Sequence, residues 1–174
     1  MAIMTWTFVA GGFGMTGLLM DGDTGVHIRI GDWIREHGAV PHQDLFGFSK
    51  PHGEWFTYEW LSGVIFSLAN SAAGLKGVTL MAATLLSLVP AFIALHAIWR
   101  GAAGVVVVPL VLLGANVLNI HFLARPHIFT LVLLSATVWM LERDRRQSSN
   151  RIWILVPLMA LWANLHGGFS SSFR

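Results

Sequence analysis

The length of the charge-free stretches constrains this sequence more than any other feature. Six stretches without Lys, Arg, Asp or Glu hold 121 of the 174 residues: 1–20, 60–75, 77–99, 101–124, 126–141 and 152–173. Charged residues make up 11% of the chain, whereas soluble domains usually contain about 25%. A soluble fold of this size has too little interior to bury so many segments of spanning length. We therefore predict an all-α, polytopic membrane helical bundle, and we exclude a soluble enzyme, a disordered chain and a nucleic-acid-binding protein.

Five of the stretches are predicted to cross the membrane, at 1–20, 77–99, 101–124, 126–141 and 152–168. A crossing needs about 20 residues at about 1.5 Å each. The stretch 126–141 has only 16 residues, but residues 128–141 are uniformly apolar and the stretch is flanked by arginines whose stems can extend along the bilayer edge. The sixth stretch, 60–75, is short and contains Ser, Asn and Gly residues. We expect a helix lying in the membrane interface there, from about 58 to 74.

A model with six spans remains open, because the distribution of positive charge favours it. If 60–75 also crosses, eight Lys and Arg residues lie inside and two outside, as the positive-inside rule prefers. With five spans the count is five on each side, leaving out the terminal Arg174. The two models differ in whether the loops 21–76 and 142–151 share a side of the membrane.

A second interfacial helix is predicted within the loop 21–59. Apolar side chains at Val26, Ile30, Trp33 and Ile34, followed by His37, have the spacing of one helical stripe. Asp32, Arg35 and Glu36 are expected on the opposite face. Asp23 or Thr24 is suitable as an N-cap, and Gly38 as the C-terminal stop. We therefore expect a helix over 24–37 that lies along the membrane surface.

Asp21 and Asp23 lie where the first predicted span meets water. Two carboxylates at this position are suitable for binding a cation or for accepting a proton as a general base. The alternative is structural: Asp23 is a common type of N-cap residue, and Asp21 can be a solvated residue at the membrane edge.

Histidines and one arginine form the second group of candidates. Seven of the eight histidines lie on the side of the 21–59 loop in the five-span model, and among them His127 and His166 end spans, as does Arg125. Imidazole and guanidinium groups suit proton transfer and phosphate binding. The alternative is that these side chains are amphipathic residues at the interface.

The order of these parts resembles the N-terminal portion of bacterial membrane glycosyltransferases of the C-type fold, which include aminoarabinose transferases and protein O-mannosyltransferases. The first span ends in DGDTGVHIRIGDWIREHG, the loop closes with EWFTYEWL, and later spans end in LARPHIF and ANLHGGF. The resemblance covers essentially the whole chain but a third to a half of a typical member. It implies a single membrane domain over 1–174 from a longer transferase in the bacterial cytoplasmic (inner) membrane, with an external first loop, which favours five spans.

The resemblance also implies inverting sugar transfer from a polyprenyl-phosphate donor to an acceptor. Asp23, or alternatively Asp21, corresponds to the general base, and basic residues hold the lipid phosphate; we assign this role to Arg125, His127, His166 and Lys50. Many members have an acid where this chain has Arg125-Pro126-His127, and several have a Lys at the position of His166. A divalent metal ion therefore remains an open expectation. The alternative functions are a non-catalytic membrane scaffold and a transporter-like protein.

Overall fold

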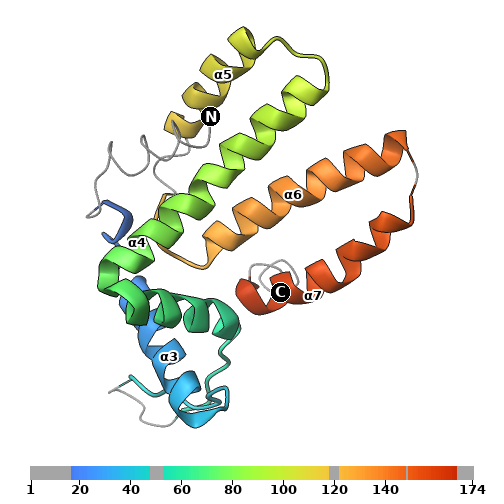
Figure 1. Cartoon of the computed structure of the whole chain (residues 1–174). Coiled ribbons are helices and arrows are strands. Elements are labelled where there is room, and N and C mark those ends of the chain that lie inside the picture. Colours follow the sequence, from blue (N-terminus) through green and yellow to red (C-terminus); the bar gives the residue numbers. More distant parts are fainter. Residues whose placement is uncertain (1–16, 48–52, 118–121, 148, 168–174) are drawn as a thin grey trace.

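The computed structural model describes residues 17–47, 53–117, 122–147 and 149–167, and this part of the chain contains helices and no β-strand (Figure 1). The all-α prediction is therefore confirmed for these residues. The helices are α3 (Asp23–His37), α4 (Trp60–Trp99), α5 (Gly104–Val117), α6 (His127–Arg146), the 3₁₀ helix η2 (Asn150–Ile154) and α7 (Leu155–Leu165). Most of the predicted first span, and Lys50, lie outside the described residues.

Helix α4 consists of two limbs that meet at a sharp bend. Ala73 and Gly74 have non-helical backbone angles, and Gly74 adopts φ 61° and ψ −157°, a combination almost restricted to glycine. Figure 1 shows the first limb and the long second limb meeting at a steep angle rather than in line. The bend falls at the end of the predicted interfacial helix 58–74. The sequence therefore located the boundary between the two helical segments within a few residues.

Among the described residues, α4 is the one helix long and apolar enough to cross a membrane. The predicted span 101–124 is helical over Gly104–Val117, and a turn follows at 122–126. Helix α6 begins at His127, within the predicted span 126–141, and continues to Arg146. Its last turn therefore consists of charged residues that were predicted to lie in the loop 142–151. The predicted span 152–168 is helical from η2 through α7.

The buried face of α3 differs from the predicted stripe. Ile30 and Ile34 are buried as expected, but Val26 and His37 are exposed, and Thr24, Ile28 and Gly31 complete the buried face. The polar face also differs, because two of its predicted members contact the first limb of α4. Ser67 donates a hydrogen bond to Asp32 at 2.6 Å, and Arg35 donates to Ser67 and Ser71 at 2.8 and 2.7 Å. The prediction was wrong at these positions because it considered α3 alone, without the serines of α4 that bind Asp32 and Arg35.

Two glycines allow α3 and the first limb of α4 to cross at very short range. A Cβ atom built on Gly31 would lie 2.0 Å from the carbonyl oxygen of Gly63. His27 and Glu59 each lie four residues, about one helical turn, before one of these glycines. The close crossing therefore brings the imidazole of His27 next to the carboxylate of Glu59.

Between α3 and α4, residues 41–44 are hydrogen-bonded to residues 53–57. Asp44 N–H donates to the Gly53 carbonyl at 2.9 Å, and Trp55 N–H donates to the His42 carbonyl at 3.0 Å. The Thr57 hydroxyl donates to the Pro41 carbonyl at 2.9 Å. These bonds return residues 55–59 to the side of α3.

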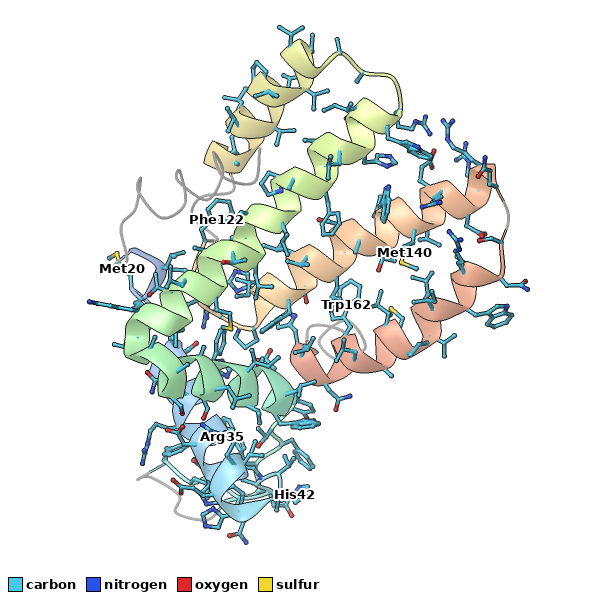
Figure 2. All side chains as sticks on the ribbon, viewed as in Figure 1. Met20, Arg35, His42, Phe122, Met140 and Trp162 are labelled. Atoms are coloured by element: carbon cyan, nitrogen blue, oxygen red, sulfur yellow. The ribbon has the colours of Figure 1, made fainter. Side chains whose placement is uncertain are left out.

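The apolar core lies between α3, α4 and α6. Buried Phe66 of the first limb of α4 packs against Phe129 of α6, with ring centroids 6.0 Å apart. In Figure 2, Phe122 lies beside the long limb of α4, and Trp162 of α7 points toward α6. At the far end of this limb, Arg100 forms an ion pair with Glu142. The helices thus separate two polar ends.

Candidate functional site

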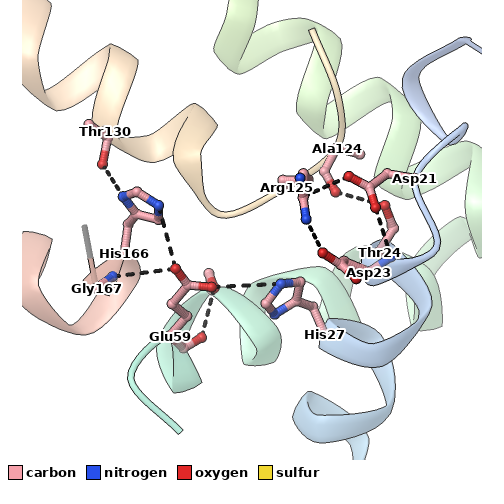
Figure 3. A network of polar contacts seen from close by, with 11 residues as sticks. Asp21, Asp23, Thr24, His27, Glu59, Ala124, Arg125, Thr130, His166 and Gly167 are labelled. Atoms are coloured by element: carbon pink, nitrogen blue, oxygen red, sulfur yellow. Dashed lines mark hydrogen bonds and ion pairs between the residues drawn. The ribbon is translucent and has the colours of Figure 1, made fainter. Parts of the chain in front are cut away.

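Arg125 joins the two acids that follow the first predicted span (Figure 3). Its Nε atom lies 2.6 Å from Asp21 Oδ2, and a second guanidinium nitrogen contacts Asp23 Oδ2. Asp21 Oδ1 also accepts a hydrogen bond from the Asp23 backbone N–H at 3.0 Å. The prediction that Asp23 or Thr24 caps α3 is therefore wrong. The N-cap residue is Gly22, which has no side chain that could cap the helix. The carboxylate of Asp21 instead accepts the hydrogen bond of the first helical N–H, that of Asp23.

Buried hydrogen bonds fix the turn that carries Arg125. The Thr24 hydroxyl donates to the Ala124 carbonyl at 2.9 Å, and the Ala124 N–H donates to the Leu18 carbonyl at 2.8 Å. Both Thr24 and Ala124 are buried. Because a buried polar group without a partner is costly, this pairing holds the 122–126 turn against the start of α3. The guanidinium of Arg125 is consequently placed beside Asp21 and Asp23.

Glu59, at the start of α4, lies between two histidines. Its carboxylate oxygens are 3.7 Å from His27 Nε2 and 3.5 Å from His166 Nε2 (Figure 3). The Gly167 N–H donates to the same carboxylate at 3.4 Å. These contacts join α3, α4 and the end of α7 in one row of polar groups.

The orientation of His166 depends on two further side chains. Trp162 Nε1 donates to the Thr130 hydroxyl at 2.8 Å, and this hydroxyl lies 2.9 Å from His166 Nδ1. A hydroxyl that already accepts one bond can donate its own hydrogen to Nδ1. The arrangement therefore favours the tautomer whose Nε2–H points to Glu59.

The acids, the guanidinium and the imidazoles surround one cavity of about 290 Å³. Its walls are formed by Asp23, His27, Glu59, Leu123, Arg125, Pro126, His127 and His166. Four candidates from the sequence thus line the same cavity: Asp23, Arg125, His127 and His166. Asp21 is set behind Arg125, and only 14% of its side chain is exposed, compared with 54% for Asp23.

Sequence reasoning counted His27 among seven histidines on one side of the membrane without selecting it, and it missed Glu59. His27 lies one helical turn after Asp23, on the same side of α3, and this spacing is the signal that identifies it. Glu59 is the last acid before a long charge-free stretch. It was not recognised because its position depends on the return of the loop and on the crossing of the two helices.

The electrostatics of the cavity are dominated by carboxylates. Burial lowers the pKa of His27 below its ordinary value, and attraction by Glu59 and Asp21 opposes this effect. A neutral His27 leaves Asp21, Asp23 and Glu59 beside one fixed cation, Arg125. Its guanidinium has five N–H donors, however, so it can contact an additional anionic group while remaining near the acids.

Within the described residues, no group of three or more His, Cys, Asp or Glu side chains is arranged to hold a metal ion. The cationic partner of the acid pair is the guanidinium of Arg125. No protein-family model, no curated protein and no solved structure matches the chain.

Proposed function

We propose that this chain belongs to a multi-pass membrane glycosyltransferase of the bacterial cytoplasmic membrane. It transfers a sugar from a polyprenyl-phosphate-linked donor to an acceptor hydroxyl on the external face. The observation that carries the proposal is the cavity beside Arg125. There, a well-exposed carboxylate, a guanidinium and several imidazoles meet at one polar end of a set of apolar helices.

A location in the membrane is supported by the surfaces of the helices. Large apolar side chains are exposed along α5, the long limb of α4 and α7, among them Val105, Leu113, Leu95 and Val156. Such surfaces are unfavourable in water and favourable in lipid. Helix α4 is long and apolar enough to cross the hydrocarbon core, which is about 30 Å thick.

The five-span arrangement is supported by the first limb of α4. Near its start Glu59 contacts His27, and near its end Ser71 accepts a hydrogen bond from Arg35. His27 and Arg35 both belong to α3, so this limb packs along α3 at the end of the molecule that holds the cavity. We infer that the first limb stays on the side of the bilayer where the cavity lies, as an interfacial helix. The long limb then crosses the bilayer.

In the proposed reaction, the Asp23 carboxylate accepts the proton of the acceptor hydroxyl as its oxygen attacks the anomeric carbon of the donor sugar. The bond between the anomeric carbon and the phosphate oxygen breaks, and the polyprenyl phosphate leaves with the electron pair. Arg125 and His127 donate hydrogen bonds to the leaving phosphate, and His166, whose Nε2–H points to Glu59, lines the same cavity. Asp21 holds Arg125 in position, which agrees with its smaller exposure.

A non-catalytic scaffold is the second candidate. The observation that favours it is the double ion pair of Arg125 with Asp21 and Asp23, because a closed network of this kind also holds two segments together. The two candidates differ in whether sugar transfer depends on the site.

Sugar transfer in membranes tests the proposal. Membranes that contain the full-length protein are incubated with radiolabelled hexose or pentose polyprenyl phosphates, and labelled product is separated from donor. We expect transfer from one donor above the level of membranes lacking the protein. An equal rate in both membranes with every donor would contradict the proposed function and favour the scaffold.

A further inference from the structure

A second cavity also borders the row formed by His27, Glu59 and His166. It has a volume of about 310 Å³ and is lined by those three residues together with Ile30, Trp55, Phe56, Thr57, Tyr58 and Gly167. We call it the aromatic cavity. The cavity beside Arg125 shares His27, Glu59 and His166 with it, so these three side chains form a common wall.

Three large aromatic side chains of the aromatic cavity remain accessible. The exposed fraction is 46% for Trp55, 63% for Phe56 and 55% for Tyr58. Backbone hydrogen bonds of Trp55 to His42 and of Tyr58 to Phe56, both 3.0 Å long, fix this stretch of the loop. The backbone that carries these exposed aromatic side chains at the cavity is thus fixed, and ligand sites are commonly lined by aromatic side chains.

Glu59 offers hydrogen-bonding capacity to the same cavity. Its carboxylate contacts within the described part of the chain are 3.4 to 3.7 Å long, and 27% of its side chain is exposed. A carboxylate has about four acceptor sites, so these long contacts leave room for shorter bonds from a ligand hydroxyl. His27 and His166 supply further polar atoms on the same wall.

The two cavities differ in charge. Arg125 lines the first cavity, whereas the described residues that line the aromatic cavity include no Lys or Arg. An anionic group therefore finds a fixed cation in the first cavity alone. The aromatic cavity, with one carboxylate and no fixed cation, favours a neutral ligand that donates hydrogen bonds.

We propose that the aromatic cavity binds a neutral carbohydrate ring. The C–H face of the ring packs on the aromatic side chains of Trp55 and Tyr58, and its hydroxyl groups donate hydrogen bonds to Glu59. As a step in sugar transfer, this binding of a carbohydrate rests on the proposed function. It identifies the acceptor of the transferred sugar as a carbohydrate. The shared wall then places an acceptor hydroxyl next to the cavity that takes the donor.

Binding of simple glycosides tests this proposal without any transfer reaction. The full-length protein in lipid nanodiscs is titrated with the methyl glycosides of glucose, galactose and mannose, and saturation-transfer NMR reports ring protons in contact with the protein. We expect one of these glycosides to bind. Because an aromatic contact is worth only a modest free energy, Trp55→Leu and Tyr58→Leu should each raise its Kd about two- to tenfold.

Trp153→Leu is the matched control, because Trp153 of η2 is 70% exposed and lines neither cavity. It should bind the glycoside as the parent does. Glu59→Gln should weaken glycoside binding, because it removes the charge while keeping the shape of the side chain. If this variant does not fold, the Trp55 and Tyr58 variants still test the site, because substitutions at these exposed positions leave the fold intact.

Two results would overturn the carbohydrate site. One is the absence of a signal above empty nanodiscs for all three glycosides. The other is an equal loss of binding in Trp153→Leu and Trp55→Leu, which would indicate contact with membrane-facing aromatic side chains in general. Glycoside binding without sugar transfer would uphold the cavity and contradict only the proposed function.

Discussion

Gly31 of α3 and Gly63 of α4 approach so closely that a Cβ atom on Gly31 would lie 2.0 Å from the Gly63 carbonyl oxygen. The neighbouring atom is backbone, so a side chain there cannot be accommodated by a rotamer change. This crossing brings together His27 and Glu59, two of the three residues that line both the cavity beside Arg125 and the aromatic cavity.

Gly31→Ala is expected to destabilise the protein and to separate His27 from Glu59. Overpacking at a close contact typically costs about 1–3 kcal/mol. Gly25→Ala is the control on the same helix, because a Cβ atom there meets nothing within 4 Å. Thermal unfolding in detergent, followed by circular dichroism, compares the two. A Gly31→Ala variant as stable as Gly25→Ala would show that the helices do not cross in this way.

Arg125→Lys should weaken the binding of polyprenyl phosphate even though the charge is kept. Lysine has no planar fork with which to contact Asp21, Asp23 and a phosphate at once. A lost charge-assisted hydrogen bond corresponds to about a tenfold rise in Kd. Binding of decaprenyl phosphate to the protein in nanodiscs measures this effect.

The control for Arg125→Lys is Arg100→Lys, because Arg100 pairs with Glu142 at the opposite polar end. This variant should bind decaprenyl phosphate like the parent. If the two lysine variants have the same affinity, Arg125 does not contact the phosphate.

His27 should make the protein less stable in mild acid. Burial lowers its pKa in the folded state below the ordinary value of 6.5, so the unfolded chain binds a proton more readily. The contribution to stability is complete above pH 6.5 and is lost as the pH falls below that value. Thermal unfolding between pH 5 and pH 8 should therefore show a smaller loss of stability in His27→Gln than in the parent. Parallel pH profiles would rule out His27 as the cause.

The two polar ends of the molecule are expected on opposite sides of the membrane. Gln43 lies in the loop before α4 and Gln147 follows α6, and both are exposed. Since the chain has no cysteine, single Gln43→Cys and Gln147→Cys variants can be labelled with an impermeant maleimide in cells whose outer membrane has been permeabilised. Labelling should occur at position 43 only. Labelling at both positions would contradict the five-span arrangement.

Local signals in the sequence predicted the local features of the fold. The helix expected over 24–37 forms at Asp23–His37, and Gly38 ends it with φ 65° and a hydrogen bond to the Ile34 carbonyl. Helix α4 bends at Ala73 and Gly74, close to the polar residues that suggested a boundary between two helical segments there. These features depend on nearby residues, which a single sequence contains.

Features that depend on distant contacts could not be predicted in the same way. The apolar stripe on α3 was misplaced because Asp32 and Arg35 bind serines of α4. Glu59 was missed because it reaches His166, more than one hundred residues further along, through the packing of α4 against α7. The five-span arrangement predicted that Asp23, Arg125, His127 and His166 meet on one face of the membrane, and they line one cavity, but the buried bond between Thr24 and Ala124 that holds them there could not be predicted.

The role of Asp23 as general base is the central claim, and comparison of Asp23→Asn with Asp21→Asn tests it most directly. Asp23 contributes its backbone N–H to the start of α3, and that group is kept in Asp23→Asn. The measurement is the rate of sugar transfer from the polyprenyl-phosphate donor by the full-length protein in membranes. Asp23→Asn should lower this rate about 10²- to 10⁴-fold, the usual effect of losing a general base. Asp21→Asn, which keeps an oxygen acceptor for the Asp23 N–H, should lower it much less. Transfer by Asp23→Asn at the parental rate would contradict the account, and a dead Asp21→Asn variant beside an active Asp23→Asn would assign the base to Asp21.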